Sequence, residues 1–167
     1  MAKFVCFGEM LLRLSAPGKE RLFQSQNLIT NFVGAEANVG VTLSRFGNEV
    51  AMVTVVPDNP IGTACEDALH AQGINTQHII KNGPRLAVYY LETGALIRPS
   101  VITYDRENSS FAQFPAAGYD WPTILDGADF LHLCGISLAV SEASYQASLA
   151  AVKAAAQPGE PGRVFVQ

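Results

Sequence analysis

The spacing of apolar residues changes from one segment of the chain to the next, and these changes predict alternating strands and helices. Residues 49–56, EVAMVTVV, are nearly continuous in apolar side chains, as in a parallel strand that is covered on both faces. Over residues 35–46 the apolar positions fall three or four apart, which places them on one face of a helix that Gly47 ends. The first part of the chain therefore begins an α/β pattern.

A second helix is predicted over the apolar stripe 61–69, which has signals at both ends. Asp58 or Asn59 can cap its first turn, because the side-chain oxygen accepts a hydrogen bond from a free backbone N–H group. Pro60 suits that first turn, and Gly73 ends the helix. The aspartate is thus better explained as a cap than as a catalyst.

Shorter apolar or β-branched segments predict further strands, and Ser141 predicts the cap of a third helix. Residues 107–127 contain several turn formers and are expected to be a loop. The segment 157–162, QPGEPG, is expected to break the third helix. The expected further strands are 3–8, 10–15, 26–32, 76–80, 85–92, 100–105, 128–135 and 163–167.

The alternation of strands and helices favours an α/β layered fold with a mostly parallel sheet. Two β-rich stretches, 10–33 and 85–106, interrupt the alternation, and they could pair with one another as a small second sheet. The last expected strand is also the end of the chain, so the large sheet would lack its closing half. Residues 1–167 are therefore expected to be one portion of an α/β domain.

Composition narrows the classes of function. Hydrophobic residues make up 49% of the 167 residues and charged residues 16%, which is typical of a globular domain. The net charge of −4 and the lack of a polybasic stretch argue against nucleic acid or an anionic membrane as a partner. The sequence shows no signal peptide and no run of about 20 apolar residues, so a cytoplasmic location is expected.

Cysteine and histidine residues do not form a recognisable metal or redox motif. Cys6, Cys65 and Cys134 are widely separated, and they are expected to be small buried side chains in a reducing compartment. His132 lies in an apolar strand, where a core histidine with satisfied hydrogen bonds is expected. The sequence therefore predicts no metal site.

Residues 31–40, NFVGAEANVG, place a glycine and small residues where the first helix must begin. One interpretation is steric, because Gly34 and Ala35 let two elements pack closely. The other is chemical, because free N–H groups at a helix start and the amide of Asn38 can bind a ligand's oxygens. Neither the phosphate loop GxxxxGK[ST] nor GxGxxG occurs in the chain, so these residues do not form a nucleotide-binding fingerprint.

The expected strands 85–92 and 100–105 carry a second group of candidate residues. Tyr89 and Tyr90 are adjacent, so one can be buried in the core while the other offers its hydroxyl to a ligand. Tyr104 and Arg106 are two positions apart and share a face, which suits recognition of a carboxylate. A solvated loop with a surface ion pair between Arg106 and its neighbour Asp105 is an equally good interpretation.

Taken together, these segments resemble the ribokinase-like (PfkB) carbohydrate kinases, and within that family the kinases of 2-keto-3-deoxygluconate. The resemblance extends to about residue 156 and corresponds to the N-terminal half of such an enzyme. The matching stretches are FGEMLLRLSAPGKERLFQ, GAEANVGVTLSRFG (34–47), VPDNPIG (56–62), RLAVYYLETGALIRPSVITYDRENSS (85–110) and FLHLCGISLAVS (130–141).

The resemblance implies a Rossmann-like α/β domain with a small β-sheet lid that closes over the sugar. The stretches 10–33 and 85–106 would form this lid, which often serves as a homodimer interface in the family. The implied reaction of the intact enzyme is ATP-dependent phosphorylation of 2-keto-3-deoxygluconate, a small sugar acid, to its 6-phospho form, with Mg²⁺ neutralising phosphate charge.

The resemblance also implies roles for particular residues. Positions that would meet the sugar hydroxyls are Gly34, Ala35 and Asn38. Tyr89 and Tyr104 would line the pocket from the lid, and Arg106 would hold the sugar-acid carboxylate; a keto-acid sugar is therefore favoured over a neutral one.

Some family features are replaced or lie outside these residues. Val33 stands where the family usually has the first glycine of a pair, and CGISLAV replaces the more usual Ser-Gly-Ile-Thr-Pro-Ala-Leu. The Asp-x-Asn-x-Arg strand and the Gly-Ala-Gly-Asp motif would follow residue 160, and neither occurs in the sequence. The catalytic base is expected beyond residue 167, so no catalytic residue is assigned, and the chain alone is expected to hold ATP and Mg²⁺ poorly. A sugar-acid binding or dimerisation module without catalysis, or a fructokinase or ribokinase type of enzyme, are the alternatives.

Overall fold

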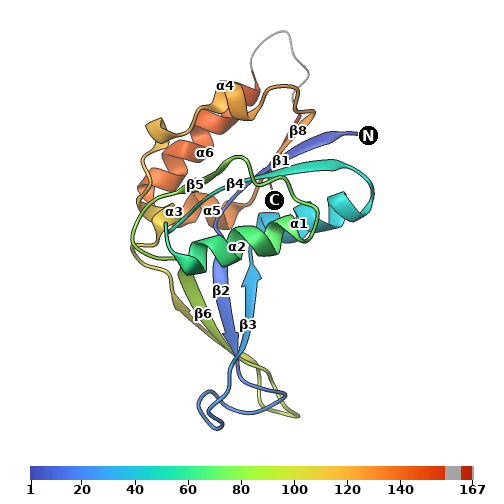
Figure 1. The fold of residues 1–167 in the computed structure, drawn as a ribbon. Coiled ribbons are helices and arrows are strands. Elements are labelled where there is room, and N and C mark those ends of the chain that lie inside the picture. Colours follow the sequence, from blue (N-terminus) through green and yellow to red (C-terminus); the bar gives the residue numbers. More distant parts are fainter. Residues whose placement is uncertain (157–162, 167) are drawn as a thin grey trace.

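The computed structural model, shown in Figure 1, describes residues 1–156 and 163–166. A five-stranded sheet has the order β5-β4-β1-β8-β9, and every neighbouring pair in it is parallel. Its strands are β1 (Lys3–Phe7), β4 (Glu49–Val56), β5 (Ile79–Lys81), β8 (Phe130–Leu133) and β9 (Arg163–Val166).

A second, smaller sheet extends from one end of this layered core (Figure 1). Its order is β3-β2-β6-β7, with antiparallel pairs at both edges and a parallel pair, β2 with β6, in the middle. The strands of this small sheet are β2 (Leu11–Ser15), β3 (Ile29–Val33), β6 (Ala87–Glu92) and β7 (Val101–Asp105). The two β-rich interruptions of the sequence therefore do pair with each other.

Helices cover both faces of the large sheet. Strand β4 is apolar throughout because its alternate residues enter two different cores. Val53 packs with the aromatic and aliphatic residues beneath α6, whereas Met52 packs with residues of α1 and α2. The helices are α1 (Ala35–Arg45), α2 (Pro60–His70), α3 (Ser110–Gln113), the 3-10 turn η1 (Ala116–Gly118), α4 (Trp121–Ile124), α5 (Gly135–Ala139) and α6 (Glu142–Ala155).

The structure confirms most of the expected elements and their caps. Asn59, not Asp58, caps α2, since its Oδ1 accepts hydrogen bonds from the N–H groups of Ile61 and Gly62. Ser141 caps α6 through a capping box with Ser144. The expected break at 157–162 and the last residue of the expected final strand lie outside the described residues.

The loop expected at 107–127 and the bounds of two expected strands were wrong. Residues 107–127 are not a plain loop, because they contain α3, η1 and α4. The strand expected at 76–80 is instead Ile79–Lys81, and the strand expected at 128–135 ends at Leu133 because α5 begins at Gly135. These helices have only four or five residues, too few for an apolar period to be visible in the sequence.

Candidate functional site

A cavity of about 220 Å³ lies where the small sheet meets the large one. All six candidate residues, which come from three separate stretches of the sequence, contribute to its wall: Gly34, Ala35, Asn38, Tyr89, Tyr104 and Arg106. The remaining lining residues are Glu9, Leu11, Val33, Glu36, Ile102, Ile136 and Ser137.

The start of α1 forms one wall of the cavity. Gly34 precedes the helix as its N-cap residue, and it provides no side-chain acceptor for the backbone N–H groups of the first turn. A Cβ atom at Gly34 would lie 2.9 Å from both the carbonyl oxygen of Glu9 and the sulfur of Met10. Asn38 is exposed, one turn further along the helix. The small residue therefore serves close packing, and the same corner presents polar groups to the cavity.

The small sheet forms the aromatic wall. Tyr89 and Tyr104 are direct partners in β6 and β7, and their ring centroids are 5.5 Å apart. The guanidinium carbon of Arg106 lies 5.5 Å from the centre of the Tyr104 ring, within the range of a cation–π contact. Tyr90 pairs with Thr103 and so points to the opposite face of the sheet, as strand alternation requires.

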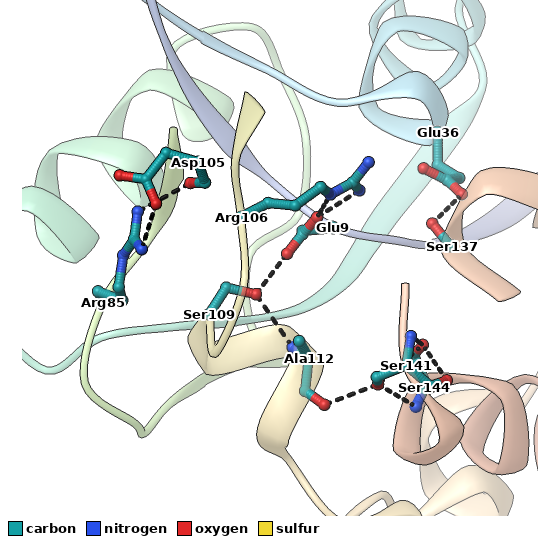
Figure 2. Close-up of polar contacts among 10 residues, drawn as sticks. All are labelled: Glu9, Glu36, Arg85, Asp105, Arg106, Ser109, Ala112, Ser137, Ser141 and Ser144. Atoms are coloured by element: carbon teal, nitrogen blue, oxygen red, sulfur yellow. Dashed lines mark hydrogen bonds and ion pairs between the residues drawn. The ribbon is translucent and has the colours of Figure 1, made fainter. Parts of the chain in front are cut away.

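Arg106 does not form the surface pair with Asp105 that one interpretation of the sequence expected. It pairs instead with Glu9, whose Oε2 accepts hydrogen bonds from Nε at 3.1 Å and Nη2 at 2.5 Å (Figure 2). The other oxygen of Glu9 accepts a hydrogen bond from the hydroxyl of Ser109. Asp105 pairs with Arg85 at 2.7 Å, and this guanidinium lowers the pKa of the Asp105 carboxyl.

A second buried carboxylate, Glu36, stands in the first turn of α1. It accepts a hydrogen bond from the hydroxyl of Ser137 at 2.6 Å and from the backbone N–H of Cys134 at 3.1 Å, so it connects α1 to the start of α5 (Figure 2). Burial raises the pKa of Glu36, and the charge of Glu9 adds to this effect. Gly8 provides the room, because a Cβ atom there would collide with the Glu36 carboxyl group.

The sequence analysis did not single out Glu9 or Glu36. Their partners lie 97 to 101 positions away along the chain, so no local pattern connects the two ends of each contact. A signal was nevertheless present, since each glutamate stands in an apolar or small-residue run where a charge is costly unless it is paired. Buried acids of this kind are informative about a site.

Among the described residues there is no group of three His, Cys, Asp or Glu side chains placed to hold a metal ion. The cysteines are free thiols, of which Cys6 and Cys65 are buried. His132 is buried as expected, but its Nε2 has no hydrogen-bond partner within residues 1–156 and 163–166, so the expectation of satisfied hydrogen bonds was wrong. No helix in the described part of the chain has the length and apolar content needed to cross a membrane.

The arrangement suits a small polar molecule with hydroxyl groups and a charged end. Backbone N–H groups and an amide lie on one side, two tyrosines on the other, and an arginine at the end of β7. Such a combination of oriented donors and aromatic faces is typical of a site that binds a small ligand by shape and hydrogen bonds.

Comparison with known proteins identifies relatives of this chain. A curated relative in Haloferax volcanii, named 2-dehydro-3-deoxygalactonokinase, is 33% identical over 141 residues, which are 84% of this chain and 44% of the relative. The crystal structure of 2-dehydro-3-deoxygluconokinase from Thermotoga maritima superposes with a TM-score of 0.94 at 36% identity and covers 100% of this chain and 51% of that one. The chain thus spans about half the length of these relatives.

A more distant solved structure shows the same fold. It is a sugar kinase from Pyrococcus horikoshii in complex with ATP, with a TM-score of 0.82 at 17% identity over 96% of this chain and 52% of that chain. The sequence pattern that describes the pfkB family carbohydrate kinases matches residues 1–166. The architecture expected from the sequence, an α/β ribokinase-like fold, is therefore confirmed, and the chain belongs to the pfkB family of carbohydrate kinases.

Proposed function

We propose that the intact enzyme phosphorylates 2-keto-3-deoxygluconate at its 6-hydroxyl with ATP, and that this chain supplies the sugar-binding half. The observation that carries the proposal is the convergence of the α1 corner, the tyrosine pair and Arg106 on one cavity. The names of the relatives from Haloferax volcanii and Thermotoga maritima support a 2-keto-3-deoxy sugar acid as the substrate.

Each wall of the cavity has a chemical role in this proposal. The N–H groups next to Gly34 and Ala35 and the amide of Asn38 bind sugar hydroxyls, because they are donors and acceptors without a competing side-chain cap. Tyr89 and Tyr104 pack against the sugar from the small sheet, which acts as the lid. Arg106 binds the carboxylate of the sugar acid through the N–H groups that Glu9 leaves free.

ATP and Mg²⁺ belong to the intact enzyme in this proposal. ATP provides the phosphoryl group, and the divalent cation offsets the charge of its phosphates. The carboxylates in the cavity of this chain are already engaged: Glu9 by Arg106 and Ser109, and Glu36 by Ser137 and Cys134. They are therefore unsuited to serve as the base that deprotonates the sugar hydroxyl.

The first test is to read the coding DNA through the codon for Gln167 and beyond. We expect Asp-x-Asn-x-Arg and Gly-Ala-Gly-Asp to be encoded there, in the same or a shifted frame. The protein made from the complete coding sequence is then assayed for ADP release with 2-keto-3-deoxygluconate, its galactonate epimer, fructose and ribose. Preference for a neutral sugar would reject the sugar-acid assignment, and turnover of the epimer alone would reassign the substrate.

We also propose that the small sheet mediates a homodimer. Its edge strand β7 is exposed along its whole length, and the loop before β7 exposes Leu96 and Ile97 completely. An exposed apolar surface of this kind is typical of a protein interface. Sedimentation of wild type and Ile97→Asp tests this: a dimer that the aspartate dissociates is expected, whereas a wild-type monomer would contradict the proposal.

A further inference from the structure

The small sheet carries a second arginine, Arg13, in the middle of its central strand β2. Leu11, two positions earlier in the same strand, lines the cavity, so Arg13 lies on the cavity face of the sheet. Tyr89, the direct register partner of Arg13 in β6, also lines the cavity. Arg13 is therefore a close neighbour of a proposed sugar-contacting residue, on the same face.

The charges around Arg13 are unbalanced. The strand residues that share this face contain no carboxylate and no other cation; they are Leu11, Ser15, Ile29, Asn31, Val33, Ala87, Tyr89, Leu91, Ile102 and Tyr104. Arg13 is half-buried, and within residues 1–156 and 163–166 it makes no hydrogen bond and no ion pair. Its Nε atom is buried without a partner.

Three other arginines in or next to the small sheet are compensated by an acidic partner. Arg85 pairs with Asp105, Arg98 with Glu92, and Arg106 with the buried carboxylate of Glu9; these are all the ion pairs that the described part of the sheet makes. Arg106 and Glu9 together carry no net charge. Arg106 can still donate its free N–H groups to a ligand, but Arg13 carries the positive charge that has no compensating carboxylate on the cavity face of the sheet.

A buried donor without an acceptor costs stability, and a half-buried guanidinium without a counter-ion costs more. Such a group is favourable when an anion is bound, because the anion restores both the hydrogen bond and the charge balance. We propose that Arg13, which lies beside the cavity-lining residues Leu11 and Tyr89, is a second specificity-determining residue of the site: together with Arg106 it selects a sugar that carries a carboxylate over a neutral sugar. This inference rests on the proposed function and concerns the same site.

The test measures binding by calorimetry to the protein made from the complete coding sequence. The probes are 2-keto-3-deoxygluconate and its neutral analogue, in which the carboxylate is reduced to an alcohol. We expect Arg13→Gln to raise the Kd for the acid about tenfold to a hundredfold, the usual effect of losing a charged hydrogen bond. The Kd for the neutral analogue should stay unchanged, and the salt dependence of acid binding should become weaker.

Two further variants serve as controls. Arg21 is exposed in the loop between β2 and β3, and within residues 1–156 and 163–166 its side chain makes no hydrogen bond or ion pair. Arg21→Gln therefore loses the same charge and should leave both Kd values unchanged. Arg13→Lys keeps the charge but loses the planar guanidinium, and it should retain part of the discrimination. Circular dichroism and Tm establish that each variant is folded.

Four results would overturn the proposal or its basis. An unchanged Kd for the acid in Arg13→Gln would show that Arg13 does not recognise the carboxylate. An equal loss for both probes would show a purely structural role. A change in sedimentation without a change in Kd would mean that Arg13 binds a second copy of the chain. If the folded wild type bound neither probe, the proposed function itself would fail.

Discussion

The buried carboxylate of Glu9 accepts two hydrogen bonds from the guanidinium of Arg106, which lies 97 positions later in the chain. Glu9 follows β1, and Arg106 follows β7, so this contact fastens the end of an edge strand of the small sheet to the carboxyl end of the central strand of the large sheet. Ser109 adds a third hydrogen bond to the same carboxylate. The contact therefore sets the position of the arginine and of the wall that it forms.

Replacing Glu9 with glutamine should lower the free energy of unfolding by about 1–3 kcal/mol, because Arg106 would lose its charged partner. The side chain of Arg106 remains 25% exposed, which moderates the loss. Chemical denaturation measures the change. Glu107→Gln is the matched control, since Glu107 is exposed and its carboxylate makes no hydrogen bond or ion pair within residues 1–156 and 163–166. Equal stability of the two variants would contradict the importance of the pair.

Gly8→Ala should destabilise the fold through Glu36. The new Cβ atom would overlap the Glu36 carboxyl group, which two hydrogen bonds hold in place. We expect a loss of about 1–3 kcal/mol, as in other overpacked cores. Glu36→Ala removes the obstacle, so the double variant should lose less than the sum of the single variants. Strict additivity would show that the two residues do not interact.

The free energy of unfolding should depend on pH through His132. Burial lowers the pKa of its imidazole in the folded protein below 6.5, the ordinary value. At a pH between the folded-state pKa and 6.5, the unfolded chain therefore binds a proton that the folded chain does not. The stability contribution of the neutral imidazole is complete above pH 6.5 and declines as the pH falls below it. His132→Leu should flatten this part of the curve, and a slope identical to that of the wild type would reject the assignment.

Two of the three thiols should be inert in the folded protein. Cys6 and Cys65 are fully buried, and burial raises the pKa of each to about 12. The reactive thiolate is therefore scarce and inaccessible at neutral pH. A thiol-specific reagent should modify only the partly exposed Cys134 before unfolding and all three cysteines after it. Rapid modification of Cys6 or Cys65 under native conditions would contradict the packing described here.

The 167-residue chain on its own should show no ATP-dependent phosphorylation of 2-keto-3-deoxygluconate. Both carboxylates of its cavity are occupied by hydrogen-bond donors, and neither is free to accept the proton of the attacking hydroxyl. A coupled assay for ADP release, with the protein from the complete coding sequence as the positive control, measures this. Turnover by the purified chain would show that the chain is catalytically sufficient.

The sequence predicted the elements whose own residues determine them. Strand β4 is apolar throughout because both of its faces are covered, and Asn59 and Ser141 each cap a helix through a contact within three residues. These signals are local, so they can be recognised without the fold. The grouping of Gly34 with Tyr104 came from family resemblance, because nothing in their spacing connects them.

The features that the sequence did not predict depend on distant partners. Helix α3 has four residues, too few to be stable alone; Ser109 caps it and Phe111 enters the core. The pairing of Arg106 with Glu9, rather than with Asp105, was equally hidden. The Arg106–Asp105 pair was one of two equal interpretations of the sequence, and the structure excludes it by placing Arg85 beside Asp105.

The parallel pairing of β2 with β6 has a consequence for protein engineering. Each antiparallel half of the small sheet is a separate insertion, and the chain between the two halves builds α1, β4 and α2 of the core. A single β-hairpin is only marginally stable in water, and neither half contains the pair that joins them. The small sheet therefore cannot be transferred as one continuous segment. Moving it to another protein requires two insertions, at sites that the recipient fold already holds in the register that β2 and β6 need to pair.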